Sequence, residues 1–406
     1  MTGCGYSRRQ FLAGTAGFLT WVHQTRIAAA EPGRDPRLVV LNLRGGLDSV
    51  GAVAPIGDDA FHKLREGALY EDTGLGKGYA LDGLFALHPS LPGLAELYQR
   101  GEASIVHATC TPYHERSHFL AQDVLESGLP GIGDFTSGWL NRALQCIQPG
   151  ERTAAKGLVL KPNMPLLMRG EAEVMTWLPG GGQDNAQDLD QQLAFLYRHS
   201  DPDLYKCLET AMQNEDYLDG MSSQAGPVAR GALPWKIKKG AQTMGKAMSS
   251  DDGPRIGAVE LDGWDTHADG MPHNPRFVRL LKQLDEMIET LRVSLGPAWK
   301  QTVIVVMTEF GRTMHINGSE GTDHGVGTVA FLVGGAVRGG RVHADWPGLS
   351  STALFEGRDL RPTTDIRAVF KGVLRDHLGI PENALAREVF PLSQSVRPLE
   401  GTVLSV

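Results

Sequence analysis

The chain has 406 residues, a formal net charge of -8 at pH 7 and 41% hydrophobic residues, enough to bury a large core. Its 50 glycines are roughly one residue in eight, against a usual share of about 7%. The mild acidity argues against a nucleic-acid binder, because such proteins usually present a basic face to the phosphates.

Residues 1–30 have the pattern of a bacterial export signal. A pair of arginines in SRRQFL (7–12) precedes a weakly apolar run, and three alanines at 28–30 suit a small-residue cleavage site. Paired arginines favour the twin-arginine route. We therefore expect a signal peptide over 1–30, the twin-arginine translocase as a partner during export, and a periplasmic or otherwise exported product. The mature chain has no apolar run of the about 18 residues that a membrane-spanning helix needs.

The three cysteines after this leader predict neither disulfides nor a thiolate site. Cys110, Cys146 and Cys207 are odd in number and widely spaced, without a CxxC motif. We expect them to be small buried side chains.

Five apolar segments predict buried strands, at 37–43, 103–108, 256–261, 302–307 and 328–333. Between the third and the fourth lies a predicted amphipathic helix, whose apolar residues fall at 277, 281, 284, 288 and 291. Strands that alternate with helices predict an α/β fold, with a mostly parallel sheet sandwiched by helices. We expect one domain over 31–406, with a largely helical insertion or cap at about 130–255.

Charged and hydroxyl side chains follow four of these predicted strands. They are Asp48 and Ser49, the segment 111–118, Asp265 and His267, and Glu309 and Arg312. Since ligands bind beyond the carboxyl ends of parallel strands, we expect these side chains to converge on one rim. Asp323 and His324, just before the last strand, are predicted to join them.

Oxygen and nitrogen ligands without sulfur suit Zn²⁺, Mn²⁺ or Mg²⁺. Asp265 and His267 lie on one side of an extended segment, at i and i+2. Taken alone, such a pair is more often a hydrogen-bonded surface turn. Together, on successive strand ends, the pairs favour a metal centre.

The predicted nucleophile is Ser117, at the start of a predicted helix. The alternative is that Ser117 is an ordinary N-cap. As a nucleophile, it would lie at a positive helix end that favours an anionic substrate. Thr111 and Ser49 are rival hydroxyls. Three arginines are candidates for binding anionic oxygens, and they are Arg44, Arg116 and Arg312.

Seven motifs in order resemble the bacterial family known as domain of unknown function 1501. They are LRGGLDS (43–49), SHFLAQD (117–123), GWLNRAL (138–144), GWDTH (263–267), MTEFGRT (307–313), GTDHG (321–325) and GGRVHADWPGL (339–349). That family is distantly similar to the alkaline phosphatase and sulfatase superfamily, whose members carry one or two metals at the same strand ends.

The resemblance implies an alkaline phosphatase-like fold with one or two divalent ions, Zn, Mn, Mg or Ca. The implied metal ligands are Asp48, Asp265, His267, Glu309, Asp323 and His324, and the implied catalytic set is Ser117, His118 and Arg312. Phe310 stands where the superfamily has a histidine ligand, which argues against a second metal. The predicted function is an exported, metal-dependent hydrolase of small phosphate or sulfate esters. The alternative is a non-catalytic cell-envelope binding or assembly protein on the same fold.

Overall fold

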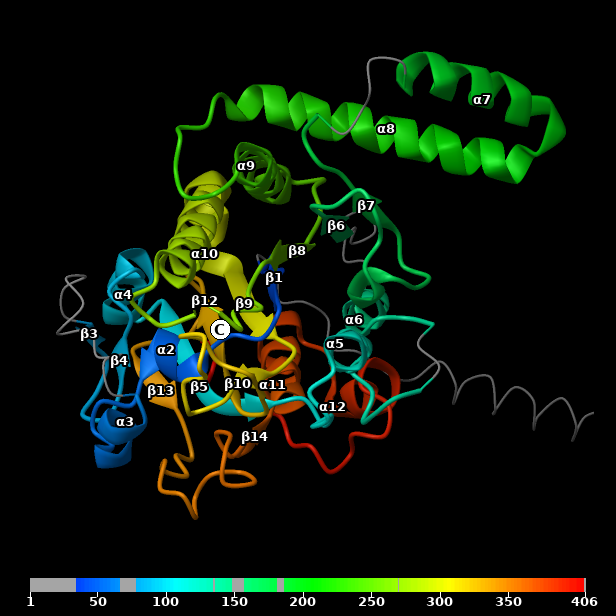
Figure 1. Cartoon of the computed structure of the whole chain (residues 1–406). Helices are drawn as coiled ribbons and strands as arrows, with labels where there is room; N and C mark the ends of the chain where they lie inside the picture. Colours follow the sequence, from blue (N-terminus) through cyan, green and yellow to red (C-terminus); the bar gives the residue numbers. More distant parts are fainter. Residues whose placement is uncertain are drawn as a thin grey trace, which may run out of the picture.

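The computed structural model describes residues 34–65, 78–133, 136–147, 157–180, 186–268 and 270–404. The predicted signal peptide lies outside these residues. Within them, the central feature is a nine-stranded sheet with helices on both faces (Figure 1). The hydrogen-bonded order is β13-β5-β12-β9-β1-β8-β6-β7, and β14 pairs with β5.

The strands of this sheet include all five predicted ones. Their bounds are β1 (Arg37–Arg44), β5 (Ala103–Cys110), β6 (Gly157–Val159), β7 (Val174–Thr176), β8 (Ile256–Asp262), β9 (Thr302–Thr308), β12 (Thr328–Val333), β13 (Arg341–His343) and β14 (Thr364–Asp365). Two smaller sheets consist of β2 (Val53–Ala54), β4 (Ala86–Leu87) and β3 (Tyr79–Ala80), and of β10 (Gly311–Arg312) with β11 (His324–Gly325).

The helices fill the connections between these strands. They are α2 (Ser49–Ala52), α3 (Asp59–Leu64), α4 (Pro92–Gln99), α5 (His118–Ser127), α6 (Trp139–Cys146), α7 (Ala186–Ser200), α8 (Pro202–Ala225), α9 (Trp235–Ser249), α10 (Pro275–Leu295), α11 (Ile366–Leu378) and α12 (Glu382–Ala384). Shorter turns of helix lie at Leu166–Met168, Gly296–Gln301 and Leu385–Val389.

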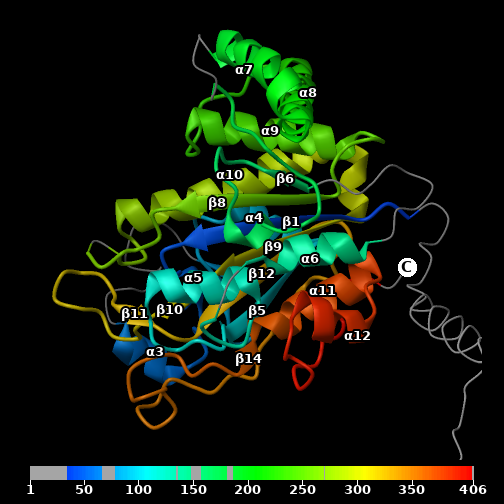
Figure 2. The same ribbon diagram turned by 90° about the vertical axis from the view of Figure 1, so that its right-hand side faces the viewer.

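The predicted fold class is confirmed, because the sheet is mostly parallel and covered on both faces. Strand β1 runs parallel to β8 and β9, and β6 runs parallel to β8 and β7. Side chains of β1 alternate between two cores: Val39 and Leu41 join the one under α4, α9 and α10, and Leu38 and Val40 join the one under α6 and α11. Figure 2 shows the sheet between α10 on one face and α6 and α11 on the other.

The predicted helix after the third strand is α10. Asn274 caps it by accepting a hydrogen bond from the backbone N–H of Arg276, and Pro275 occupies its first position. Its apolar stripe, which includes Phe277, Leu284 and Leu291, is buried against the sheet. The 3.6-residue periodicity of a helix brings these positions onto one face.

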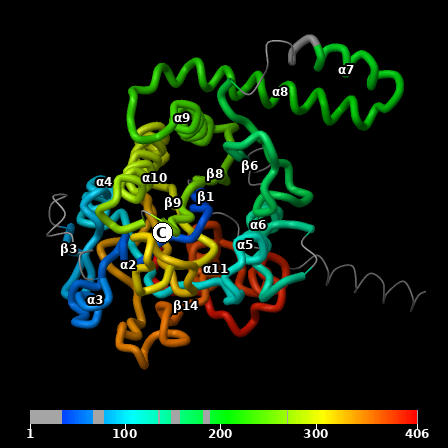
Figure 3. Tube along the Cα trace, viewed as in Figure 1, coloured from blue at the N-terminus to red at the C-terminus, as the bar shows by residue number. Residues whose placement is uncertain are grey.

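Helices α6 to α9 lie in the region predicted as an insertion and make up about half of it. The short strands β6 and β7, in the same region, add to the edge of the main sheet. Helices α7 and α8 form a hairpin that projects from the body (Figures 1 and 3). Among the described residues, no helix combines the length and the apolar character needed to cross a membrane.

One strand runs against the others and decides where the site forms. Strand β12 is antiparallel to both β9 and β5. The residues just before β12 therefore reach the same edge of the sheet as those just after β5, β8 and β9. This reversal brings the 321–325 segment to the predicted rim.

Candidate metal centre

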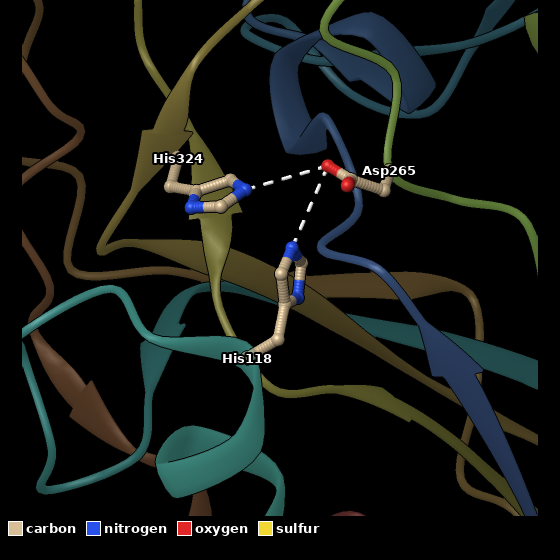
Figure 4. A group of neighbouring side chains, drawn as sticks. All are labelled: His118, Asp265 and His324. Carbon is tan, nitrogen blue, oxygen red and sulfur yellow. Dashed lines mark hydrogen bonds and ion pairs between the residues drawn. The ribbon is translucent and has the colours of Figure 1, made fainter.

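Three side chains from distant parts of the chain meet at this edge of the sheet (Figure 4). His118 is the first residue of α5, Asp265 follows β8, and His324 lies in β11. Each offers one ligand atom, and the three atoms lie within 4.8 Å of one another. His118 Nε2 is 3.5 Å and His324 Nε2 is 3.3 Å from Oδ1 of Asp265. The group can hold a metal ion.

His267 lies next to this group, on its more exposed side. Its Nε2 lies 3.1 Å from Oδ1 of Asp265 and 2.8 Å from Nε2 of His324. About half of the His267 side chain is exposed, at 47%, against 24% for His324. We refer to His118, Asp265, His267 and His324 as the His₃Asp cluster.

The other nitrogen of each imidazole is held by an acceptor. Nδ1 of His118 lies 2.8 Å from the carboxylate of Glu309. Nδ1 of His324 lies 3.0 Å from the backbone carbonyl of Arg116. Nδ1 of His267 lies 3.4 Å from the carboxylate of Asp323. Carboxylates and carbonyls only accept, so these contacts favour a hydrogen on each Nδ1. A ring in that tautomer presents the lone pair of Nε2.

These lone pairs fit a divalent metal. Nε2 of His267 and Nε2 of His324 lie 2.8 Å apart, close enough for one ring to donate to the other or for both to bind one cation. Nε2 of His118 is buried without a hydrogen-bond partner among the described residues. Ligand atoms of a tetrahedral site with bonds of about 2.0–2.1 Å lie roughly 3.3 Å apart. The distances of 3.3 and 3.5 Å from His324 and His118 to Asp265 match that spacing, whereas the 2.8 Å between His267 and His324 is shorter.

Charges around the cluster keep its carboxylate ionised. Burial alone would raise the pKa of Asp265, but the Arg312 guanidinium and the nearby histidines lower it to about 2. Burial and the neighbouring positive charges lower the pKa of His324. The hydrogen bond to Glu309 raises the pKa of His118, although burial opposes it. An anionic carboxylate and three imidazoles therefore lie together in an arrangement that suits a cation.

Arg312, which was predicted to stabilise charge on a substrate, is a buried structural clamp. Its side chain is 0% exposed and donates to Oδ1 of Asp265 at 2.7 Å. Its remaining N–H groups donate to backbone carbonyls, those of Gly45, Gly46, Trp264 and Thr322. In the β10–β11 pair Arg312 also lies opposite His324. Arg312 thus ties three loops of the rim together and has no exposed surface to offer a substrate.

Glu309, which was expected among the ligands, lies behind the cluster. Its carboxylate is fully buried and accepts at Oε1 from Nδ1 of His118, from the backbone N–H of Gly45 at 2.8 Å and from Nε2 of Gln122 at 3.1 Å. Although burial would raise the pKa of Glu309, these hydrogen bonds lower it overall. The carboxylate holds the ring of His118 from the side away from Asp265.

Asp48 does not join the cluster. It forms a buried ion pair with both ends of the Arg65 guanidinium, at 2.7 and 2.9 Å. Arg65 also donates to the backbone carbonyls of Thr313 and Met314. Both side chains of the pair are at most 1% exposed. The charge that a metal would have neutralised is neutralised by Arg65.

Asp323, which was predicted to be a metal ligand, lies behind the ring of His267. Its Oδ1 accepts from Asn317 at 3.1 Å and faces Nδ1 of His267. The hydrogen bond from Asn317, followed by the contact with His267, lowers the pKa of Asp323. Asp323 therefore fixes the ring of His267 in the way that Glu309 fixes that of His118.

The three candidate hydroxyls differ in their surroundings. Ser117 is the N-cap residue of α5, in an extended conformation, and its side chain makes no cap hydrogen bond. Thr111 is buried and donates to the carbonyl of Tyr113 at 3.1 Å. Ser49 is fully buried without a hydrogen-bond partner for its Oγ among the described residues. Ser117 is the partly exposed hydroxyl next to a cluster residue in the chain.

The other two candidate arginines also form ion pairs with carboxylates of this chain. Arg116 pairs with Asp359 at 2.8 Å and with Glu356 at 2.5 Å. Arg44 pairs with Glu126 and Glu260, both at 3.0 Å.

The profile of the family described as "Protein of unknown function (DUF1501)" matches residues 96–389, which is more than half of the chain. The chain belongs to this family. That result confirms the resemblance found from the seven motifs. No curated protein matches this member of the DUF1501 family.

Several solved structures resemble this DUF1501 protein at low identity. The C-terminal periplasmic domain of EcEptC from Escherichia coli, in complex with Zn, matches at 12% identity and a TM-score of 0.35, over 75% of this chain and 74% of that one. An alkaline phosphatase superfamily protein from Vibrio parahaemolyticus matches at 13% and 0.34, over 75% and 62%. Murine ectonucleotide pyrophosphatase/phosphodiesterase 5 matches at 9% and 0.32, over 68% and 57%. The function of the DUF1501 chain is therefore proposed from its own side chains.

Sequence reasoning missed Gln122, which contacts Glu309, and Asn317, which holds Asp323. Gln122 carried a usable signal, because it lies four residues after His118 and hence on the same face of a helix. Asn317 lies in the loop between β10 and β11, and no spacing rule connects it to its partner.

Proposed function

We propose that this chain is an exported, metal-dependent hydrolase of phosphate or sulfate esters. The observation that carries the proposal is the convergence of three imidazole Nε2 atoms on one carboxylate oxygen of Asp265. Three nitrogens and one oxygen suit Zn²⁺ or Mn²⁺ better than Mg²⁺ or Ca²⁺, which prefer oxygen ligands. The cluster supplies ligands for a single metal.

The residues around the cluster have separable proposed roles. A bound divalent cation supplies a Lewis acid that stabilises negative charge on oxygen. His118, Asp265, His267 and His324 would hold it. Arg312 keeps Asp265 ionised and in place.

Ser117 is the proposed nucleophile. Its hydroxyl is not used to cap α5, and the N-terminus of a ten-residue helix favours an anionic ester beside it. Attack by its oxygen on phosphorus or sulfur would form a seryl ester and break the substrate's ester bond. The leaving oxygen would keep the electron pair of that bond and take up the Ser117 proton. Water would then hydrolyse the seryl ester, releasing phosphate or sulfate and restoring the hydroxyl. Phe310, whose ring centroid lies 4.7 Å from that of His118, closes the cluster on its inner side, so an ester would approach from the exposed side of His267.

Export and domain organisation belong to the same proposal. The twin-arginine pattern at 7–12 supports removal of a leader near residue 30 and a mature single domain over 31–406. The twin-arginine route accepts folded proteins, so a metal can be loaded in the cytoplasm before export.

Elemental analysis of the purified mature protein tests the metal site. We expect about one Zn or Mn per chain, lost in Asp265→Ala and in His324→Ala. His315→Ala is the matched control, since His315 is an exposed histidine of the same β10–β11 connection. Metal content that is far below one per chain and unaffected by the two cluster variants would rule the site out.

Hydrolysis of chromogenic esters tests the reaction. The mature protein would be assayed with a phosphate monoester, a phosphate diester and a sulfate ester, each carrying p-nitrophenol. We expect turnover of at least one, with loss of most activity in Ser117→Ala at unchanged metal content. A metal-loaded protein that turns over none of them would instead support a non-catalytic envelope protein on this fold.

A further inference from the structure

Helix α5 presents a polar stripe to the edge of the sheet. His118, Gln122 and Glu126 lie four residues apart, which places them on one face of the helix. Each of them hydrogen-bonds to residues at strand ends rather than to solvent. Gln122 is 8% exposed and Glu126 is 3% exposed. A polar stripe that is buried in this way must be fully paired.

Arg44 holds two successive turns of this stripe. From the end of β1, its guanidinium donates to Oε1 of Gln122 and, at 3.0 Å, to Oε1 of Glu126. A third contact, also 3.0 Å, reaches Glu260 of β8. The Lys161 ammonium donates to the other oxygen of Glu260. Helix α5 is thereby fixed against the ends of two neighbouring strands.

Gln122 links Arg44 to the His₃Asp cluster through Glu309. Its Oε1 accepts from Arg44, so its Nε2 faces Glu309 and donates to Oε1 at 3.1 Å. The same Oε1 accepts from Nδ1 of His118. An amide is required at position 122, because a carboxylate could accept from Arg44 but could not donate to Glu309.

We propose that Gln122 is a positioning residue, which holds Glu309 and through it aims Nε2 of His118 at the metal position beside Asp265. The inference rests on the proposed metal site. In this arrangement Glu309 supports a metal ligand from behind, and Gln122 connects it to Arg44. Partners of this kind typically change metal affinity by about 10–100-fold when they are removed.

Cobalt binding to the mature protein, stripped of metal with a chelator, tests this inference. Co²⁺ is titrated into wild type, Gln122→Glu and Gln122→Met, and the visible d–d absorption reports the ligand geometry. Gln122→Glu keeps the contact with Arg44 and sets a second carboxylate against Glu309, whereas Gln122→Met keeps the shape and removes both polar contacts. Gln145→Glu makes the same chemical change at an exposed position of α6 and serves as the control.

We expect both Gln122 variants to bind Co²⁺ about 10–100-fold more weakly than wild type, with an altered d–d spectrum. The control should match wild type in both respects. Wild-type affinity and spectrum in either folded Gln122 variant would overturn the positioning role alone. A wild-type protein that binds no Co²⁺ would overturn the proposed metal site and this inference together.

Discussion

Nδ1 of His118 and the buried carboxylate of Glu309 lie 2.8 Å apart. The contact places Glu309 behind His118, on the side of the ring away from Asp265. It leaves Nε2 of His118 facing Asp265.

Substitution of Glu309 by glutamine should weaken metal binding without abolishing it. The amide oxygen can still accept from His118, but the negative charge that strengthens the ligand is lost. We expect the dissociation constant for Zn²⁺ to rise about 10–100-fold, measured by competition with a chelating dye. Glu96→Gln, at an exposed glutamate of α4, is the control. A complete loss of metal, as in Asp265→Ala, would mean that Glu309 binds the ion directly.

Asp48 should matter for stability and not for metal content. Asp48→Asn leaves the buried Arg65 guanidinium without its counter-charge. Removing one partner of a buried pair costs about 3–5 kcal/mol of the free energy of unfolding, measurable by urea denaturation. The double variant Asp48→Leu with Arg65→Met should recover much of that loss. Loss of metal in a folded Asp48→Asn protein would instead indicate that Asp48 contributes to metal binding.

Gly45 should not accept a side chain. It has a φ of +127°, and a Cβ there would lie 2.3 Å from the backbone nitrogen of Asp265. The strained backbone alone costs about 1–3 kcal/mol, and relief of the clash would displace Asp265. We therefore expect Gly45→Ala to lower both stability and metal affinity. Gly83→Ala, at an exposed glycine with no atom within 4 Å of the added Cβ, should leave both unchanged.

The stability of the protein should fall between pH 6.5 and 4, partly because of His377. The ring is buried in α11 with Nε2 2.8 Å from the carbonyl of Arg37. Burial lowers the pKa of His377 from 6.5 to about 4. Below pH 6.5 His377 becomes protonated in the unfolded chain, whereas in the folded chain it stays neutral until about pH 4. The free energy of unfolding therefore decreases over this window, by up to about 3 kcal/mol.

Urea denaturation at pH 7 and pH 4.5, with a chelator present, measures this effect. We expect a drop in stability that is about 2–3 kcal/mol smaller in His377→Gln than in wild type. Burial also lowers the pKa values of His88 and His107 to about 4, and their contribution remains in both proteins. Equal drops in the two proteins would show that His377 is not the source.

The paired arginines of the leader should be required for export. Arg8→Lys together with Arg9→Lys keeps the positive charge but removes the twin-arginine pattern. We expect the protein to accumulate in the cytoplasm as a folded, unprocessed precursor, detected by cell fractionation and its larger mass. Continued export of the double variant would point to another route.

Much of the fold could be predicted because it depends on local patterns. The apolar runs that became β1 and β9, and the spacing of Phe277 to Leu291 in α10, follow from the burial that each element needs. The position of Asp265 and His267 beyond a strand end followed from the same reasoning. The outer contacts did not: helical spacing places Gln122 on the face of His118 without indicating its contact with Glu309, and no spacing rule connects Asn317 to Asp323.

The sequence by itself determined which strands form, that their ends carry the polar chemistry, and that the chain belongs to a family with these motifs. The tertiary structure decided which of the candidates meet. The antiparallel direction of β12 brought His324 to the rim. Arg65 neutralised Asp48, and His118 engaged Glu309. Burial patterns are local and can be read along the chain, whereas the partner of a buried charge is chosen by contacts between residues that are distant in sequence.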